Sequence, residues 1–199
     1  MKLIESDQYI TDQGLDPKEV WTAEYVKGLH DNLKKPKPKR KSKGLQQFLM
    51  SFLASCTSLL DVGCGFNPRR YKLPDLKMVG VDVSPEMIAL GQKLHPEFTF
   101  IEGNVYDLPF DDNSFDAVQS FGMLRHMKKW ESALQEMIRV AEKKLIFTHL
   151  IGNSVFKCGQ YQWCTTNEKI ERLLPYSIET RIIKSWVGFE SILFLVELQ

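Results

Sequence analysis

The sequence of 199 residues is short of the features that mark disulfide-bonded, metal-binding and membrane-spanning proteins. It has four cysteines, and Cys158 and Cys164 are separated by five residues with neither a C-x-x-C pair nor matching histidines. We therefore expect free thiols and no metal site. The longest uncharged stretch, residues 44–60, contains Gln, Ser and Thr, so it is better divided between a helix and a strand than assigned to a membrane span. Charged residues within the first seven positions argue against a secretory signal, and we expect a cytoplasmic protein with no membrane span.

Acidic residues are absent from residues 34–43 (KKPKPKRKSK), which hold seven of the 26 lysines and arginines. The remaining 19 basic residues face 25 acidic ones, so the net charge of +1 conceals a basic segment on an acidic protein. Two prolines and dense like charge predict an extended, solvated linker. The alternative is an arm, Lys34 to Lys43, that contacts the phosphates of RNA or an anionic substrate. No aromatic residue is interleaved with the lysines, which removes base stacking and disfavours nucleic acid as a partner.

A third glycine is missing from the most informative segment, residues 59–68 (LLDVGCGFNP). Residues 58–62 have the pattern of a buried strand, and Gly63 and Gly65 that of a tight turn. Asn67 and Pro68 then predict a helix N-cap and a first-turn proline, which would bring backbone N–H groups close to a ligand. Asp82 lies 19 residues beyond Gly63, about where a doubly wound fold places the acid that binds ribose hydroxyls. The pattern therefore indicates a nucleoside site.

The absence of a third glycine argues against a dinucleotide as the ligand. A dinucleotide fingerprint requires G-x-G-x-x-G, and Pro68 occupies the third glycine position. No G-x-x-x-x-G-K-[ST] phosphate loop is present either. Asp61 places a carboxylate where a pyrophosphate would lie, and like charges in a partly buried cleft repel each other. The same carboxylate suits a cationic ligand.

Strand and helix patterns alternate along the chain. Strands are expected at residues 58–62, 78–83, 98–102, 115–120 and 145–148, with amphipathic helices at 45–52, 84–90 and 132–140. Short connections between them imply a parallel sheet with helices on both faces. Residues 181–184 and 192–198 follow with no long helix between them, which favours an antiparallel hairpin. The fold class predicted is α/β: a Rossmann-like, doubly wound, mainly parallel seven-stranded sheet with a C-terminal antiparallel hairpin, in three αβα layers.

Several motifs resemble the class I S-adenosylmethionine-dependent methyltransferases. The segments 61–65 (DVGCG) and 79–87 (VGVDVSPEM) carry the resemblance first, followed by 102–110 (EGNVYDLPF) and 115–120 (FDAVQS). Residues 134–140, with Glu136 and Arg139, resemble a helix of the small-molecule branch that includes ubiquinone and menaquinone methyltransferases. The implied cofactor is S-adenosyl-L-methionine, with S-adenosyl-L-homocysteine as product. Its sulfonium and ammonium groups agree with an acid at Asp61.

The resemblance implies a cofactor site made from the ends of successive strands. Asp82 would bind both ribose hydroxyls, Met87 would pack on the adenine, and Asn104 would accept the adenine amino group where the family usually has an acid. Val105 would offer its backbone N–H to the ring. The full set of expected cofactor-binding residues is Asp61, Gly63, Cys64, Gly65, Asp82, Val83, Met87, Asn104, Val105, Ser120 and Phe121.

The acceptor side is less constrained by the sequence. His126 and His149 follow two strands at the functional edge, and each is either a general base or substrate contact, or a structural residue. Arg125 either binds an anionic substrate or is solvated. Aromatic residues before and after the core either stack on a planar acceptor or cover the sheet. The candidate substrate residues are therefore Tyr9, Trp21, Tyr25, Arg125, Tyr161 and Trp163.

We expect one domain over residues 1–199, since this length buries a substantial core. It would comprise an N-terminal lid and basic arm (1–44), a cofactor-binding core (45–150) and a substrate-side loop with the terminal hairpin (151–199). The leading hypothesis is methyl transfer to a small-molecule acceptor. The alternatives are methylation of RNA or protein with the basic arm as docking segment, and a non-catalytic or non-methylating member of the same fold. The acceptor and the oligomeric state stay open.

Overall fold

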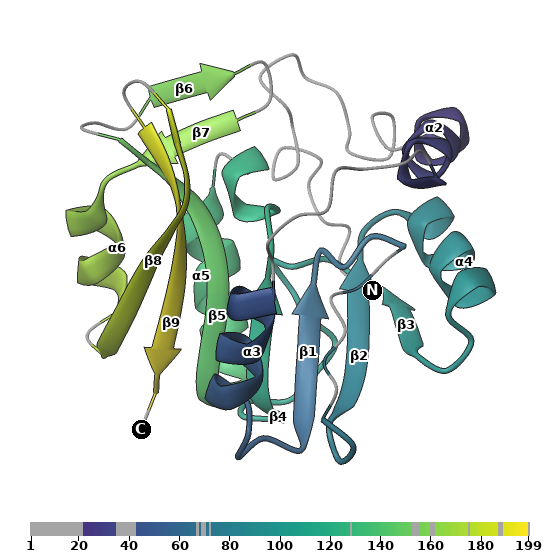
Figure 1. Cartoon of the computed structure of the whole chain (residues 1–199), viewed down its shortest axis with the longest axis horizontal. Helices are drawn as coiled ribbons and strands as arrows, with labels where there is room; N and C mark the ends of the chain where they lie inside the picture. The colour runs from purple at the N-terminus through teal and green to yellow at the C-terminus, as the bar shows by residue number, and fades with distance from the viewer. Residues whose placement is uncertain are drawn as a thin grey trace.

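A twisted sheet runs through the middle of the molecule, and helices cover both of its faces (Figure 1). The structure is a computed structural model that describes residues 22–34, 43–66, 68, 71, 73–127, 129–152, 156–159, 162–174, 176–186 and 189–198. Within these residues the sheet has nine strands, in the order β3-β2-β1-β4-β5-β7-β6, with β9 beside β5 and β8 beside β9.

Five parallel strands form one half of the sheet. They are β1 (Ser58–Val62), β2 (Lys77–Asp82), β3 (Thr99–Glu102), β4 (Phe115–Ser120) and β5 (Ala141–Gly152). All five were predicted, although β5 is three times as long as expected. Because the strands are parallel, their carboxyl ends meet at one edge of the sheet, where ligands bind in open α/β folds.

The antiparallel half of the sheet contains the predicted terminal hairpin and one more hairpin. Strands β8 (Ser177–Trp186) and β9 (Phe189–Glu197) pair with each other, and β9 pairs with β5 along nine residues. The additional hairpin consists of β6 (Phe156–Gly159) and β7 (Gln162–Thr165). β7 joins β5 at Leu150 and Ile151, beyond the last residue that β4 pairs. The predicted seven strands are therefore confirmed, and an inserted hairpin extends the sheet over the carboxyl end of β4.

Helices on the two faces bury separate cores. On one face α3 (Lys43–Phe52) packs Leu49 against Leu59, Ala117 and Ile146. On the other face α5 (Trp130–Val140) packs its apolar side against alternate residues of the same strands. The remaining helices in the described part of the chain are α2 (Ala23–Lys34), α4 (Pro85–Leu94), α6 (Asn167–Leu173) and the short 3-10 turn η2 (Leu124–His126). The three-layer prediction is confirmed.

Two expected segment boundaries lie inside elements of the structure. α3 begins at Lys43 and β5 ends at Gly152, so the divisions after residues 44 and 150 cut a helix and a strand.

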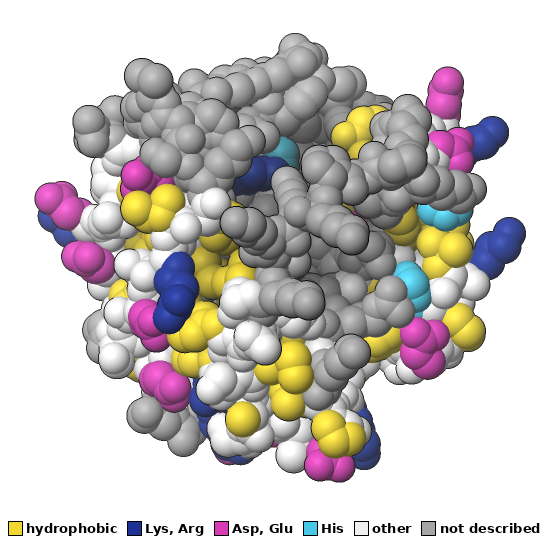
Figure 2. Space-filling view, in the orientation of Figure 1, with side chains coloured by type: hydrophobic (Ala, Val, Ile, Leu, Met, Phe, Trp, Pro, Cys, Tyr) yellow, Lys and Arg dark blue, Asp and Glu magenta, His cyan; other side chains and the backbone are white. Residues whose placement is uncertain are grey.

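β8 lies at the outer side of the sheet and exposes Ile182, which is 61% accessible. Beside it, Arg181 stacks on the ring of Phe48 at 3.4 Å. Figure 2 shows apolar and charged side chains interspersed on this face.

The segment between β1 and β2 differs from the prediction. Pro68 is not helical, and the described residues between Val62 and Lys77 contain no helix. Asn67, the expected N-cap, lies outside the described residues. Pro74 lacks an N–H and interrupts helical hydrogen bonding, and Tyr71 instead anchors the segment by donating to Oε1 of Gln119 at 2.7 Å. The expectation of a helix N-terminus directly behind the glycine turn is therefore wrong at Pro68.

None of the described helices is both long enough and apolar enough to cross a bilayer.

Candidate functional site

The turn after β1 is shaped by two glycines. Gly63 and Gly65 have φ angles of +69° and +55°, a conformation in which L side chains are strained. The N–H groups of Gly63 and Cys64 donate to the carbonyl of Val81 at 2.8 and 3.1 Å, and that of Gly65 donates to Asp82 at 2.9 Å. All three N–H groups are therefore hydrogen-bonded to other groups of the protein.

Asp82 stands at the carboxyl end of β2, as predicted. Its Oδ2 accepts from Gly65 N–H and its Oδ1 accepts from Ser84 N–H at 3.0 Å. Burial raises the pKa of Asp82, and these backbone hydrogen bonds oppose the rise. Each carboxylate oxygen has a second acceptor position, so both can also bind a ligand hydroxyl. Asp82 thus holds the glycine turn and still has capacity for a ribose.

Asp61 gives the site a second carboxylate. It is only 4% exposed, and it pairs in register with Gln119 of β4, so both side chains lie on the same face of the sheet. The pKa of the Cys64 thiol is raised by burial, and further by the charges of Asp61 and Asp82. The negative charges of both carboxylates therefore reach the glycine turn and make this part of the site acidic.

The side chain of Cys64 packs in the interior of the protein. Its Sγ lies 2.8 Å from the position that a Cβ on Gly80 would take, and it belongs to a small core with Ile88 and Phe100. No group of three or more His, Cys, Asp or Glu among the described residues is arranged to hold a metal ion. Cys64 can contribute to a cofactor site only through its backbone.

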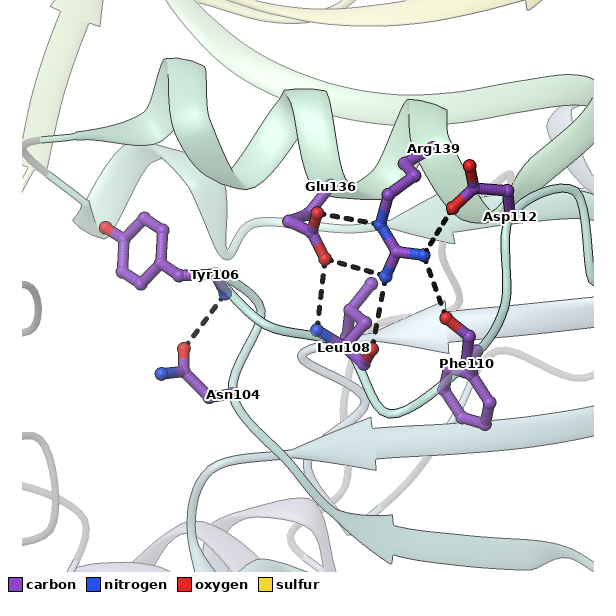
Figure 3. A network of polar contacts seen from close by, with 7 residues as sticks. All are labelled: Asn104, Tyr106, Leu108, Phe110, Asp112, Glu136 and Arg139. Atoms are coloured by element: carbon purple, nitrogen blue, oxygen red, sulfur yellow. Dashed lines mark hydrogen bonds and ion pairs between the residues drawn. The ribbon is translucent and has the colours of Figure 1, made fainter. Parts of the chain in front are cut away.

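The loop after β3 carries Asn104 and Val105. The Asn104 Oδ1 accepts from the N–H of Tyr106 at 2.9 Å, and Val105 is buried in the larger core. Gly103 N–H donates to the carbonyl of Asp82 at 2.9 Å, which ties this loop to the end of β2. Figure 3 shows how Glu136 and Arg139 of α5 reach the same loop further along.

The N-terminal helix α2 packs beside the glycine turn and α4. Val26 of α2 packs on Phe66, which follows the glycine turn, and on Met87 of α4. The ring of His30 meets Phe66 edge-on at 5.8 Å. Tyr25 is 46% exposed on this helix, which lies by α4 and not by the end of β5 (Figure 1). The described N-terminal helix therefore packs against α4 and the residue that follows the glycine turn.

Four of the expected substrate residues cannot be placed. Tyr9, Trp21 and Tyr161 lie outside the described residues, and Trp163 belongs to β7 but its side chain is not described. Two of the expected cofactor-binding residues, Val83 and Phe121, are half-buried and directly follow β2 and β4.

The loop after β4 comes next to the glycine turn. A Cβ on Gly63 would meet Sδ of Met123 at 2.7 Å, so the two loops are in close contact. Ser120 at the end of β4 is fully buried, and its Oγ has no hydrogen-bond partner within the described part of the chain. Arg125 Nε donates to Nε2 of His126 at 3.3 Å, which requires that nitrogen to carry a lone pair. Arg125 and His126 lie on η2, directly after Met123, which contacts the glycine turn.

His149 does not end its strand, because β5 continues to Gly152. It is only 1% exposed, and its ring lies 4.8 Å from that of Trp130, edge to face. Its Nδ1 lies 3.1 Å from the carbonyl oxygen of Leu150. Burial lowers the pKa of His149 to about 4. The expected position at the open edge of the sheet is therefore wrong.

Sequence reasoning missed three contacts that shape the site. Tyr71 reaches Gln119, Met123 fills the space above Gly63, and Trp130 covers His149. Each contact joins residues far apart in the sequence through side chains, so no local pattern announces it. Pro68 followed by Pro74 was the available signal that the segment with Tyr71 would not be a helix.

The comparison with family models matches residues 60–147 to the methyltransferase domain, and this range contains the glycine turn, Asp82 and the loop of Asn104. Residues 60–147 are therefore similar to a methyltransferase domain. Among curated proteins, the chain is 27% identical to ajmaline N-methyltransferase of Rauvolfia serpentina, over 65% of this chain and 54% of that protein. It is 42% identical to demethylmenaquinone methyltransferase of Renibacterium salmoninarum, over 42% of this chain and 36% of that protein. The chain thus spans about a third to a half of these relatives.

Solved structures share the fold of the methyltransferase domain. Magnesium protoporphyrin IX methyltransferase of Synechocystis with bound S-adenosylhomocysteine aligns with a TM-score of 0.70 and 15% identity, over 92% of this chain and 98% of that one. The cyclase SpnF aligns with a TM-score of 0.74 and 14% identity, over 92% and 95%. At this identity the likeness concerns the fold alone.

Proposed function

We propose that the protein transfers a methyl group from S-adenosyl-L-methionine to a small-molecule acceptor, releasing S-adenosyl-L-homocysteine. The observation that carries the proposal is the acidic, donor-poor turn: Asp61 and Asp82 act on residues 63–65, whose N–H groups are bonded within the protein. A pyrophosphate needs donors and positive charge, which this turn does not offer. A cofactor with a ribose, an ammonium and a sulfonium fits it.

Each end of the cofactor has residues that suit it. Asp82 would accept the ribose hydroxyls, and Asp61 would neutralise the ammonium directly or through water. Asn104 and Val105 would bind the adenine, next to Met87. The buried Oγ of Ser120 has unused hydrogen-bonding capacity for the methionine end. Gly63, Gly65, Val83 and Phe121 would shape the walls, and Cys64 would contribute its backbone.

The bound cofactor supplies a methyl group made electrophilic by the sulfonium. The chain's own task is to align the acceptor, keep water out and, where the acceptor carries a proton, remove it. His126 of η2 is our candidate for that last role. Its Nε2 accepts a hydrogen bond from Arg125 Nε at 3.3 Å, so this contact would have to break before Nε2 takes a proton from the acceptor. His149, buried behind Trp130, would position this region and take no proton from the acceptor.

The substrate class is inferred from the relatives. Two of the proteins that the chain resembles in sequence are named for the methylation of ajmaline and of demethylmenaquinone. Arg125, Tyr161 and Trp163 are the proposed acceptor contacts, together with Tyr9 and Trp21. We place the reaction in the cytoplasm and treat residues 1–199 as one functional domain.

A non-methylating reaction is the second candidate, because a cyclase shares this fold over almost the whole chain. Methylation of RNA or protein, with Lys34 to Lys43 as the docking arm, is the third. Both alternatives keep the cofactor site. The second candidate changes the reaction, and the third changes the methyl acceptor.

Two measurements test the proposal. Calorimetry should detect binding of S-adenosylhomocysteine to the purified chain and none of NAD, whose pyrophosphate would face Asp61. Incubation of the chain with methyl-labelled cofactor and separate metabolite, RNA and protein fractions should then label the metabolite fraction. Absence of S-adenosylhomocysteine binding would overturn the cofactor assignment. Binding with label only in RNA or protein would select the third candidate, and binding with no label in any fraction would select a non-methylating role.

A further inference from the structure

We propose that Glu136 and Arg139 of α5 are positioning residues for recognition of the nucleobase. They hold the loop of residues 103–114 from behind, so that Asn104 and Val105 are fixed before the ligand arrives. This inference rests on the proposed function, since it assumes that the nucleobase of the cofactor lies at this loop.

The side chain of Arg139 donates hydrogen bonds to backbone carbonyl groups of the loop as well as to a loop side chain. Its Nη2 donates to the carbonyl of Leu108 at 3.1 Å, and its Nη1 donates to the carbonyl of Phe110 at 2.9 Å. Nη1 also meets Asp112 at 2.8 Å, and the Arg139 carbonyl accepts from Asn113 N–H at 2.9 Å. One side chain therefore contacts three positions of the loop within five residues.

Glu136 completes the arrangement one helical turn earlier. Its Oε1 accepts from Arg139 Nε at 2.8 Å and its Oε2 accepts from Nη2 at 2.9 Å, a two-point pairing. The same Oε2 accepts from the N–H of Leu108 at 3.1 Å. The hydrogen bond from Arg139 lowers the pKa of Glu136, so the pair stays ionised at neutral pH. Leu108 is thus held at both its N–H and its carbonyl, as Figure 3 shows.

The loop needs such support because it has little regular structure. The backbone pairing inside the loop consists, among the described residues, of the isolated bridge between Asn104 and Asp107 and the hydrogen bond from Phe110 N–H to the carbonyl of Leu108 at 2.8 Å. At its start Gly103 is tied to the carbonyl of Asp82, and at its end Leu108 and Phe110 are tied to α5. Asn104 and Val105 lie between these two anchors. α5 is a rigid support, because Leu134 and Met137 are fully buried against the sheet.

The test compares two ligands in the full-length chain. S-adenosylhomocysteine carries an amino group on its base, and its hypoxanthine analogue carries a carbonyl there. Arg139→Gln should weaken binding of S-adenosylhomocysteine by about tenfold while changing the analogue much less, because only the adenine edge depends on a fixed Asn104. Glu136→Gln should have the same effect in a weaker form. Arg172→Gln, an exposed substitution on α6, is the matched control and should leave both affinities unchanged.

The outcomes separate the two hypotheses. If the unchanged chain fails to bind S-adenosylhomocysteine, the proposed function fails. If the unchanged chain binds and prefers adenine, but Arg139→Gln keeps both its affinity and its preference, the positioning role is overturned. An equal loss for both ligands would also overturn it, because general loosening of the fold has no reason to discriminate between bases. Should Arg139→Gln not fold, the milder Glu136→Gln decides between the same outcomes, with folding checked by its thermal transition.

Discussion

The Nδ1 of His149 lies 3.1 Å from the carbonyl oxygen of Leu150, while its ring stands edge-on to Trp130 at 4.8 Å. A neutral imidazole satisfies this contact with its proton on Nδ1, which leaves Nε2 as an acceptor. No partner for Nε2 is found among the described residues. His149 is therefore held in one neutral form inside the apolar face that carries α5.

Acid should destabilise the protein through this histidine. The folded-state pKa of His149 is about 4, and the value in an unfolded chain is about 6.5. Only the unfolded state takes up the proton between these values, so stability is complete above about pH 6.5 and is lost as the pH falls towards 4, by up to about 3 kcal/mol. Urea unfolding at pH 7 and pH 4.5 measures this loss.

His149→Gln provides the comparison, because glutamine does not titrate. The variant should lose less stability than the unchanged chain between the same two pH values, whatever its stability at pH 7. His30→Gln on α2 leaves the buried histidine in place and should keep the full pH dependence. An identical pH dependence in His149→Gln would show that another group is responsible.

Removal of the Asp82 carboxylate should weaken cofactor binding. Asp82→Ala eliminates the charge-assisted hydrogen bonds to the ribose, and we expect affinity for S-adenosylhomocysteine to fall by roughly 1.5–3 kcal/mol in calorimetry. The variant should also be less stable, since Gly65 and Ser84 lose their acceptor. Asp75→Ala, at an exposed position before β2, is the control. Full affinity in Asp82→Ala would remove the ribose from this position.

The glycine at position 63 should not tolerate a side chain. Gly63→Ala combines a positive φ, which costs about 1–2 kcal/mol, with a methyl group 2.7 Å from Sδ of Met123. We expect lower thermal stability and weaker cofactor binding. Gly28→Ala in α2 has no atom within 4 Å and should be neutral or stabilising by up to about 1 kcal/mol. Similar behaviour of the two variants would contradict the strained turn.

The sequence was informative where local chemistry dictates local structure. Ser84 and Pro85 predicted the start of α4, and the structure has Ser84 as N-cap with its side chain accepting from Met87 N–H. Asp82 could likewise be placed at the end of β2, because an apolar strand and the spacing from Gly63 fix its position. Short-range rules of this kind also located β4 to the residue.

Prediction failed where pairing or packing at long range decides the outcome. β6 and β7 have four residues each, and they pair with each other while β7 joins the end of β5, which no local propensity reveals. The same reason explains His149: a strand end was expected after Thr148, but β9 pairs with β5 as far as Gly152 and carries the strand past it. The donors of the glycine turn are consumed by Val81 and Asp82, contacts that only the folded sheet creates.

A buried carboxylate at the opposite end of the sheet should control stability in acid. Asp116 Oδ2 accepts from the N–H and hydroxyl of Thr57 at 2.6 and 2.8 Å and from Ser58 N–H at 3.2 Å, and its Oδ1 accepts from Lys143 at 2.5 Å. Although burial by itself raises the pKa of Asp116, the hydrogen bonds from Lys143 and Thr57 outweigh it and hold the pKa well below its usual range. The ionised form of Asp116 therefore joins β4 to the start of β1 and to β5.

Asp116→Ala should cost about 1–3 kcal/mol in urea unfolding at pH 7, because the backbone N–H groups of Thr57 and Ser58 lose their part-buried acceptor. The pH dependence has a definite sign: a depressed folded-state pKa gives stability that is complete above the unfolded value of about 3.9 and is lost as the pH falls below it. Asp116→Asn keeps the shape without the charge, so its stability should change less than that of the unchanged chain between pH 4.5 and pH 2.5. Lys143→Met removes one donor only and should reduce this acid sensitivity in part. Equal acid sensitivity of Asp116→Asn and the unchanged chain would mean that the carboxylate is protonated in both states, and that its contacts do not depend on charge.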